Sequence, residues 1–258
     1  MLREVKGLVL RTTDISDSDR MLTIYTEEAG IISAHAKGAR SLKSRKMPAS
    51  MQFCYASFVL YERQERISVR EATLIESFFS LRDSIEGLAL GGYITEVLSE
   101  VGTADPEPEL LRLALNSLYA ISKGRHSLAK IKAAFEIRVA TILGFMPDVI
   151  SCALCGAKEG DFYFDIMAGA VECRECYRRS ERNEAPLSDE HESHIVYILT
   201  PAARTAFGYC IYSPQEKLLS FNISDEDMHY LSRAAEAYLL NHLERGFRTL
   251  DFYNEVKR

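Results

Sequence analysis

Hydrophobic and polar residues follow two different periods along the chain, and the change comes near residue 80. Before that point, short runs rich in β-branched and aromatic residues stand between turn residues, a pattern typical of strands. Five such runs occupy residues 6–11, 21–26, 30–36, 53–61 and 67–75. Five strands without a long helix predict a small antiparallel barrel, and they favour an OB-fold. An SH3-like barrel or an open meander would have the same strand count.

From about residue 81, apolar residues recur every three or four positions, which predicts helices. Helices are expected over 85–98 and from 109 to about 124, then from Ser127 to Ile142, from Pro201 onward, and over 228–243. The sequence therefore predicts an α+β protein of two domains. Residues 1–80 would form the barrel, and residues 81–258 a helical domain with an insert at about residues 148–180.

Four cysteines define that insert, in the pairs Cys152-x-x-Cys155 and Cys173-x-x-Cys176. Two such pairs at this separation are typical of a zinc site, in which each pair chelates the ion across a tight turn. Two disulfides, or two unrelated reduced pairs, are the alternatives. Because four thiolates fill a tetrahedral shell, the sequence predicts a structural zinc ion with no open position for catalysis. The residues between the pairs predict a short hairpin.

Composition indicates a reducing compartment. It also shows that charge is unevenly distributed along the chain. The 258 residues contain no apolar run long enough to span a bilayer, and no signal peptide precedes the first strand. We therefore expect a cytoplasmic protein, in which thiols favour metal over disulfides. The net charge is −6, yet residues 1–80 carry 12 Lys and Arg against 10 Asp and Glu, while the remainder carries 19 against 27.

Much of that positive charge lies between the third and fourth predicted strands. No Asp or Glu occurs from Ala29 to Tyr61, and glycine, serine and proline make the basic segment a loop. Such a loop on a small barrel can follow a phosphate backbone without reading bases, so we expect polyanion binding. A solvated loop is the alternative. The candidate residues are Lys37, Arg40, Lys43, Arg45 and Lys46.

Aromatic residues accompany the same strands. Some of them could stack on bases, although alternation along a strand buries every second side chain, so most are expected in the core. They are Tyr25, Phe53, Tyr55, Phe58 and Tyr61.

The third predicted helix carries cations beside an apolar stripe. This pattern would suit a groove for a short acidic and hydrophobic peptide tail. A core helix with a solvated rim is the alternative. The candidate residues are Leu128, Ile131 and Phe135 in the stripe, with Lys130, Lys132 and Arg138 beside it.

The sequence carries no signature of catalysis. A glycine-rich phosphate loop, a Gly-x-Ser-x-Gly elbow and a recognisable Cys and His nucleophile pair are all absent. We therefore expect a binding protein rather than an enzyme.

In order and spacing, several segments together resemble the RecO family of bacterial recombination mediators. They are residues 6–11, 37–40 with the basic continuation, 86–93, 143–147 leading into the first cysteine pair, and 169–173. The resemblance covers nearly the whole chain and implies an N-terminal OB-fold followed by a helical domain with a zinc motif.

It also implies a function in DNA repair. Such a protein would bind single- and double-stranded DNA, anneal complementary strands, and join RecR in loading RecA on DNA coated by single-strand-binding protein. It would act at the nucleoid and dock that protein's acidic C-terminal tail on its helical domain. A zinc-ribbon adaptor that binds RNA in translation or transcription is the second hypothesis, and an annealing assay would separate the two.

Overall fold

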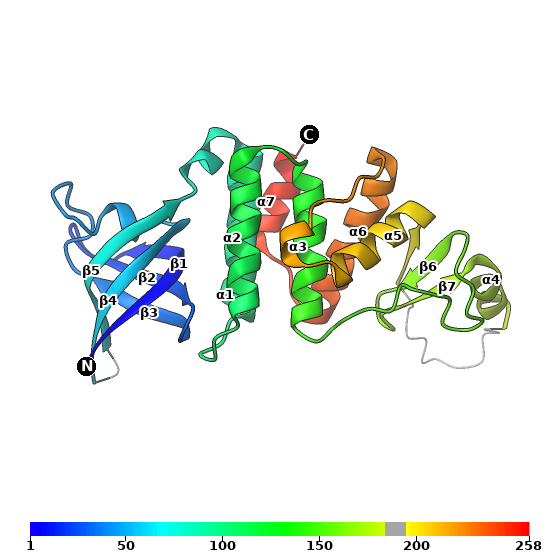
Figure 1. The fold of residues 1–258 in the computed structure, drawn as a ribbon, viewed down its shortest axis with the longest axis horizontal. Coiled ribbons are helices and arrows are strands. Elements are labelled where there is room, and N and C mark those ends of the chain that lie inside the picture. The colour runs from blue at the N-terminus through cyan, green and yellow to red at the C-terminus, as the bar shows by residue number, and fades with distance from the viewer. Residues whose placement is uncertain (65, 184–194, 258) are drawn as a thin grey trace. The chain divides into compact units, whose positions relative to one another are not determined.

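The computed structural model describes residues 1–64, 66–183 and 195–257 (Figure 1). Packing divides the chain into two compact units. Unit 1 comprises Met1–Arg125 together with Phe247–Arg258, and unit 2 comprises His126–Gly246. In the part of the chain that is described, no helix is both long and apolar enough to cross a membrane.

Unit 1 begins with a closed five-stranded barrel, which confirms the predicted OB-fold. Its strands are β1 (Leu2–Asp14), β2 (Arg20–Thr26), β3 (Gly30–Ala36), β4 (Cys54–Arg63) and β5 (Arg66–Ser77). They follow the order β1-β2-β3-β5-β4, and β1 pairs with β4 to close the barrel. Because side chains alternate between the two faces of a strand, residues such as Leu22, Ala34 and Phe58 point into the core. The β3–β5 seam is parallel and short, pairing Ala34 with Ile67 and His35 with Ser68.

The basic segment between β3 and β4 is a series of turns attached to the barrel. Backbone hydrogen bonds join Ser41 to Gly38 and Ser44 to Ser41 in successive turns, and a short 3₁₀ helix follows at Pro48–Ser50. Ala39 and Ala49 are fully buried in the barrel core. The prediction of a loop is therefore confirmed, and its two ends are fixed by apolar packing.

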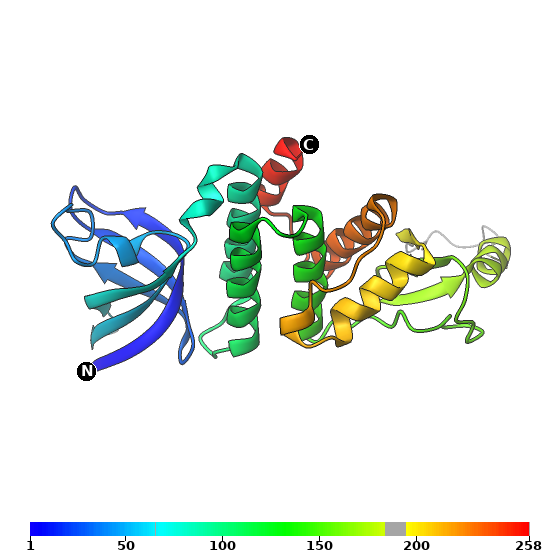
Figure 2. The ribbon, with the colours of Figure 1, turned by 45° about the horizontal axis from the view of Figure 1, so that its top comes forward.

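Unit 1 also contains the helices α1 (Ile85–Val101), α2 (Pro108–Lys123) and α7 (Arg248–Val256). Both α2 and α7 pack on α1, which also touches β1 (Figure 2). A Cβ atom on Gly91 would lie 2.3 Å from Leu81 Cδ2, so any larger residue here would force the Leu81 side chain to move. Because α1 packs against the barrel, the compact units divide after Arg125. The domain boundary expected near residue 80 stays a prediction.

Unit 2 is built around α3 (Leu128–Ile142), which packs against α5 (Pro201–Tyr212) and α6 (Asp225–Leu243). Its small antiparallel sheet has the order β7-β6-β8, from β6 (Phe162–Asp165), β7 (Ala170–Cys173) and β8 (Val196–Leu199). The hairpin of β6 and β7 confirms the prediction between the cysteine pairs. The sequence pattern missed β8, and it also missed α4 (Arg174–Asn183).

Candidate nucleic-acid interface and metal centre

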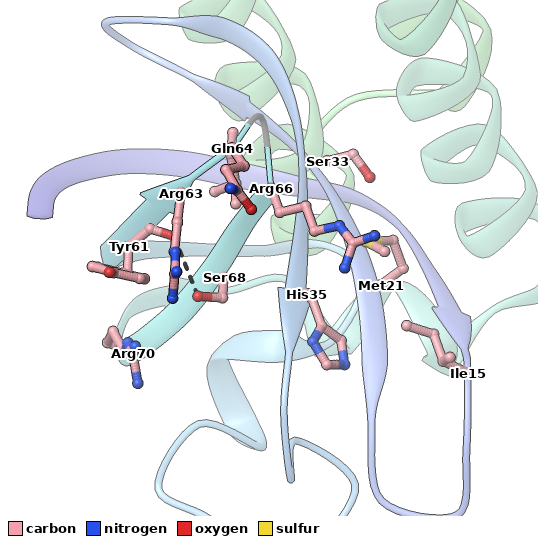
Figure 3. Close-up of a pocket in the computed structure, with 11 residues that line it drawn as sticks. Ile15, Met21, Ser33, His35, Tyr61, Arg63, Gln64, Arg66, Ser68 and Arg70 are labelled. Atoms are coloured by element: carbon pink, nitrogen blue, oxygen red, sulfur yellow. Dashed lines mark hydrogen bonds between the residues drawn. The ribbon is translucent and has the colours of Figure 1, made fainter. Parts of the chain in front are cut away.

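A cleft of about 960 Å³ lies over the β3–β5 seam on the outside of the barrel (Figure 3). Ser33 and His35 reach it from β3, because residues that alternate with the buried Ala34 face outward. The β1–β2 loop contributes Ile15 on the opposite flank. This is the face between two loops on which OB-folds bind oligonucleotides.

The β4–β5 hairpin supplies most of the cations of the cleft. Arg63 ends β4, Arg66 begins β5 directly opposite it, and Arg70 follows farther along β5. A β-bulge leaves Arg70 between Val69 and Glu71 without a register partner on β4, and such bulges redirect a side chain. The guanidinium carbon of Arg70 lies 4.6 Å from the centre of the Tyr61 ring, which also lines the cleft.

Among the described residues that line the cleft, none is acidic. In the sequence the cleft arginines alternate with Glu62, Glu65 and Glu71, so the local charge looks balanced. One of these acids is directed away from the cleft, since Glu62 lies 3.8 Å from Arg3 on the neighbouring strand β1. The result is a concave cationic surface with an aromatic ring, which suits a single-stranded nucleic acid.

These arginines were not predicted from the sequence, because the positive charge of the first 80 residues was assigned to the loop between the third and fourth strands. The signal that could have found them is the alternation Arg66-x-Ser68-x-Arg70 within a strand. Of the aromatic residues considered as stacking platforms, only Tyr61 lines the cleft. Tyr25, Phe53 and Phe58 are buried in the core as expected.

The five predicted loop cations fall into two groups. Lys37, Lys43 and Arg45 are exposed. Arg40 is anchored, since its Nε lies 3.3 Å from Asp14 Oδ2 and its Nη1 donates to Ser16 O at 2.6 Å. Lys46 is half-buried and its Nζ donates to Val69 O at 3.4 Å.

The loop and the cleft share one electrostatic environment. Burial lowers the pKa of Lys46, and the positive charges of Arg70 and Lys37 lower it further, while Asp19 acts in the opposite direction. Lys46 is therefore close enough to a cleft cation and to a loop cation to be influenced by both. The predicted cationic loop and the arginine cleft are neighbours on one barrel.

The four cysteines of the predicted metal site meet in unit 2, with their sulfur atoms all within 4.8 Å of one another. The Sγ atoms of Cys155 and Cys173 lie 3.7 Å apart. Four thiolates about 2.3 Å from a tetrahedral zinc ion would be about 3.8 Å from each other, so the donor set fits this ion. Cys152, Cys173 and Cys176 are buried and Cys155 is exposed. The site can hold a metal ion.

Backbone donors and mutual hydrogen bonds perturb these thiols in opposite directions. Although burial opposes ionisation, the N–H groups of Cys173, Cys155 and Leu154 lower the pKa of Cys152 to about 6. Hydrogen bonds with the thiols of Cys155 and Cys173 raise the pKa of Cys176 to about 12. Like charges this close resist a second ionisation, and a bound divalent cation would remove that resistance.

The residues predicted to form a peptide groove on α3 lie mostly inside unit 2. Ile131, Phe135, Lys130, Lys132 and Arg138 are buried, and Leu128 is half-buried. Burial alone would lower the pKa of Lys132, but the carboxylates of Glu136 and Glu236 raise it. The Lys132 Nζ lies 2.8 Å from the first carboxylate and 2.7 Å from the second.

The other two cations of this helix bind backbone oxygens. Arg138 donates from Nε to Cys210 O at 2.9 Å and from Nη2 to Ser213 O at 2.5 Å, at the C-terminal end of α5. Lys130 Nζ donates to Phe221 O and to Asn222 Oδ1. These hydrogen bonds tie α3 to neighbouring segments instead of forming an open cationic rim, because α5 and α6 cover the stripe.

Comparison with known proteins connects this architecture with a family. A family model described as the N-terminal part of recombination protein O matches residues 1–78, and one described as its C-terminal part matches residues 82–251. A protein named DNA repair protein RecO from Acetivibrio thermocellus is 30% identical over 257 residues, covering 99% of this chain and 97% of its own.

Two further relatives with the same name also match most of the chain. The one from Desulforudis audaxviator is 30% identical over 256 residues, 98% of this chain and 96% of its own. The one from Bacillus pumilus is 32% identical over 190 residues, 73% of each chain. With both family models matched in order on an OB-fold barrel and a cysteine-bearing helical unit, the chain belongs to the RecO family.

Proposed function

We propose that this chain acts in DNA repair and recombination as a mediator that binds single-stranded DNA on its barrel. It anneals complementary strands and, with RecR, helps to load RecA on DNA coated by single-strand-binding protein. The observation that carries the proposal is the cationic cleft over the β3–β5 seam, with Tyr61 beside Arg70. The relatives' name, DNA repair protein RecO, supports the same role.

The chemistry of the cleft supports a sequence-tolerant mode of binding. Arginine and lysine neutralise phosphates and release condensed counterions, whatever the base sequence. An aromatic ring can stack on any base, because every base has a π-face. The exposed loop residues Lys37, Lys43 and Arg45 extend this surface beyond the cleft. Double-stranded DNA, which offers phosphates but no free bases, should bind through the charges alone.

Salt titration of DNA binding tests the proposal. The affinity of wild-type protein for a labelled single-stranded oligonucleotide should fall steeply with salt. Replacing Arg66 and Arg70 by glutamine should flatten the plot of log affinity against log salt by roughly 0.7 for each phosphate that is no longer neutralised. Arg178→Gln with Arg179→Gln is the matched control, since these exposed residues on α4 of unit 2 remove the same charge.

The control separates local binding of phosphates from a general effect of net charge. If the cleft binds phosphates, the control variant should keep the wild-type slope. Equal changes in the two variants would assign the effect to net charge and remove the cleft from the interface. Tight binding of RNA with no annealing of DNA would favour the adaptor hypothesis.

Docking of the single-strand-binding protein's acidic tail on unit 2 is a further part of the proposal. The predicted groove residues of α3 support it only weakly, because Leu128 alone retains substantial exposure. A tail peptide titrated against wild type and against Leu128→Asp would test whether this end of the helix takes part. Unchanged affinity would move the tail site elsewhere. A pull-down would test the proposed partnership with RecR.

We also propose that the ion held by the four cysteines is zinc and that it stabilises unit 2. When bound, it would link the knuckle at Cys152 and Cys155 to the end of β7 and the start of α4. Four sulfur ligands leave no position for substrate, so no chemical step is assigned to the metal. Metal analysis of the purified protein tests this proposal.

A further inference from the structure

The β1–β2 loop and the base of the basic loop are joined by a cluster of hydrogen bonds centred on Asp19. Its Oδ1 accepts from the backbone N–H of Gly38 at 2.8 Å and from Ser18 Oγ at 2.7 Å. Its Oδ2 lies 3.2 Å from Nε2 of His35, which lines the cleft. One carboxylate therefore touches both the cleft wall and the backbone immediately after Lys37.

Arg40 extends this connection on the far side of Gly38. Its backbone N–H donates to Ser18 O at 2.9 Å, and its guanidinium reaches Ser16 O and Asp14. The first turn of the basic loop is thus held against the β1–β2 loop from two directions. At its other end the same loop is fixed by Ala49 in the barrel core.

We propose that Asp19 is a positioning residue for DNA binding, which holds the first turn of the basic loop beside the arginine cleft so that one strand touches both. This proposal rests on the proposed function of the barrel. An acid beside a cationic surface repels DNA, so its presence there needs a compensating effect. Preorganisation is such an effect, because ordering a loop on binding costs affinity.

The carboxylate is ionised at the pH at which the protein works. The backbone N–H of Gly38 holds the pKa of Asp19 below its ordinary value, and Ser18 and His35 act in the same direction. A depressed pKa in the folded state contributes stability above the unfolded value and loses it as pH falls through the folded value. The negative charge that strengthens the hydrogen bond from Gly38 is therefore present at neutral pH.

Electrostatics and loop positioning predict opposite effects of an Asp19 substitution on DNA affinity. Asp19→Ala removes a negative charge near bound DNA, which by electrostatics alone would tighten binding. If Asp19 positions the loop, affinity for a labelled single-stranded oligonucleotide should instead weaken by roughly three- to tenfold, because the loop must be ordered on binding. The salt slope should also flatten, because fewer loop cations reach the strand.

Two variants of equal charge isolate the hydrogen bond. Asp19→Asn keeps an oxygen that can accept from Gly38, so it should bind at least as tightly as wild type. Asp17→Ala removes an exposed acid from the same loop and should leave binding unchanged or slightly tighter. If Asp19→Ala binds as tightly as Asp17→Ala, the positioning role is overturned.

Hydrogen exchange of the Gly38 amide, measured without DNA, tests the hydrogen bond itself. Exchange should be faster in Asp19→Ala than in wild type or Asp17→Ala, while thermal melting shows that the barrel is folded. Unchanged exchange at Gly38 would overturn the inference whatever the DNA result. By contrast, the proposed function would be refuted if the wild-type protein did not bind DNA in a salt-dependent manner. Faster exchange at Gly38 in Asp19→Ala would then still show that Asp19 holds the loop.

Discussion

Replacing Lys132 by methionine should destabilise unit 2 more than the loss of a surface charge would. The side chain of Lys132 is only 1% exposed, and that of its partner Glu136 is 0% exposed. The second partner, Glu236 on α6, is 27% exposed. The substitution therefore leaves one fully enclosed carboxylate without this cation, while the other can turn toward water.

The expected loss of unfolding free energy follows from the difference in exposure between these two carboxylates. Breaking a buried ion pair by removing one partner costs about 3–5 kcal/mol, because the remaining charge is desolvated and uncompensated. Only Glu136 is fully enclosed, so we expect a loss near the lower limit, about 3 kcal/mol of unfolding free energy. In wild type the raised pKa of Lys132 means that this stabilisation is fully present below the ordinary lysine value of 10.5 and is lost as pH rises through the higher value of the folded state.

The change in unfolding free energy can be measured by urea denaturation, with circular dichroism as the signal. The control is Lys132→Met combined with Glu136→Gln, which removes the enclosed charge while keeping the shape of the side chain. The double variant should recover much of the stability that the single variant lacks. A single variant within about 1 kcal/mol of wild type, or a double variant no more stable than the single one, would refute the account of this cluster.

Further variants probe the other sites. Cys173→Ser should abolish stoichiometric metal and lower the melting temperature, because metal binding contributes folding free energy; unchanged melting would argue against a structural ion. Arg138→Glu should lower the melting temperature of unit 2, because it removes the hydrogen bonds to Cys210 O and Ser213 O; a specific loss of tail affinity with unchanged melting would restore this residue to a peptide site. Lys37→Ala should flatten the DNA salt slope by roughly 0.7 without altering stability. Arg40→Ala should alter both, because Arg40 also pairs with Asp14; identical effects of these two loop variants would contradict their assigned roles.

Strands and helices were predictable because their patterns are local. In β4 the run of aromatic and β-branched residues predicts the strand, and the buried residues Ala56, Phe58 and Leu60 then alternate with half-buried neighbours. The cysteine pairs were equally readable, since each chelating turn spans four residues. The four sulfur atoms of these pairs do lie close together, as the prediction requires.

The arrangement of charges was not predictable in this way. The cleft arginines alternate with acids in the sequence, and only the folded barrel shows that Glu62 pairs with Arg3 on β1 instead of lining the cleft. Similarly, the stripe on α3 shows that Lys132 lies beside apolar residues but not that Glu236 covers it from α6. Both ion-pair arrangements depend on contacts between segments that are distant in the chain, and the periodicity of one segment does not reveal such contacts.

Photo-crosslinking tests the central claim most directly, because it identifies the residues that touch the strand. A single-stranded oligonucleotide carrying 4-thiothymidine would be irradiated with the full-length protein, and the attached peptides identified by mass spectrometry. We predict crosslinks at Tyr61 and at the peptide containing His35, which line the cleft over the β3–β5 seam, and their loss at high salt. Crosslinks confined to unit 2, or equally strong at high salt, would contradict the assignment of DNA binding to the barrel.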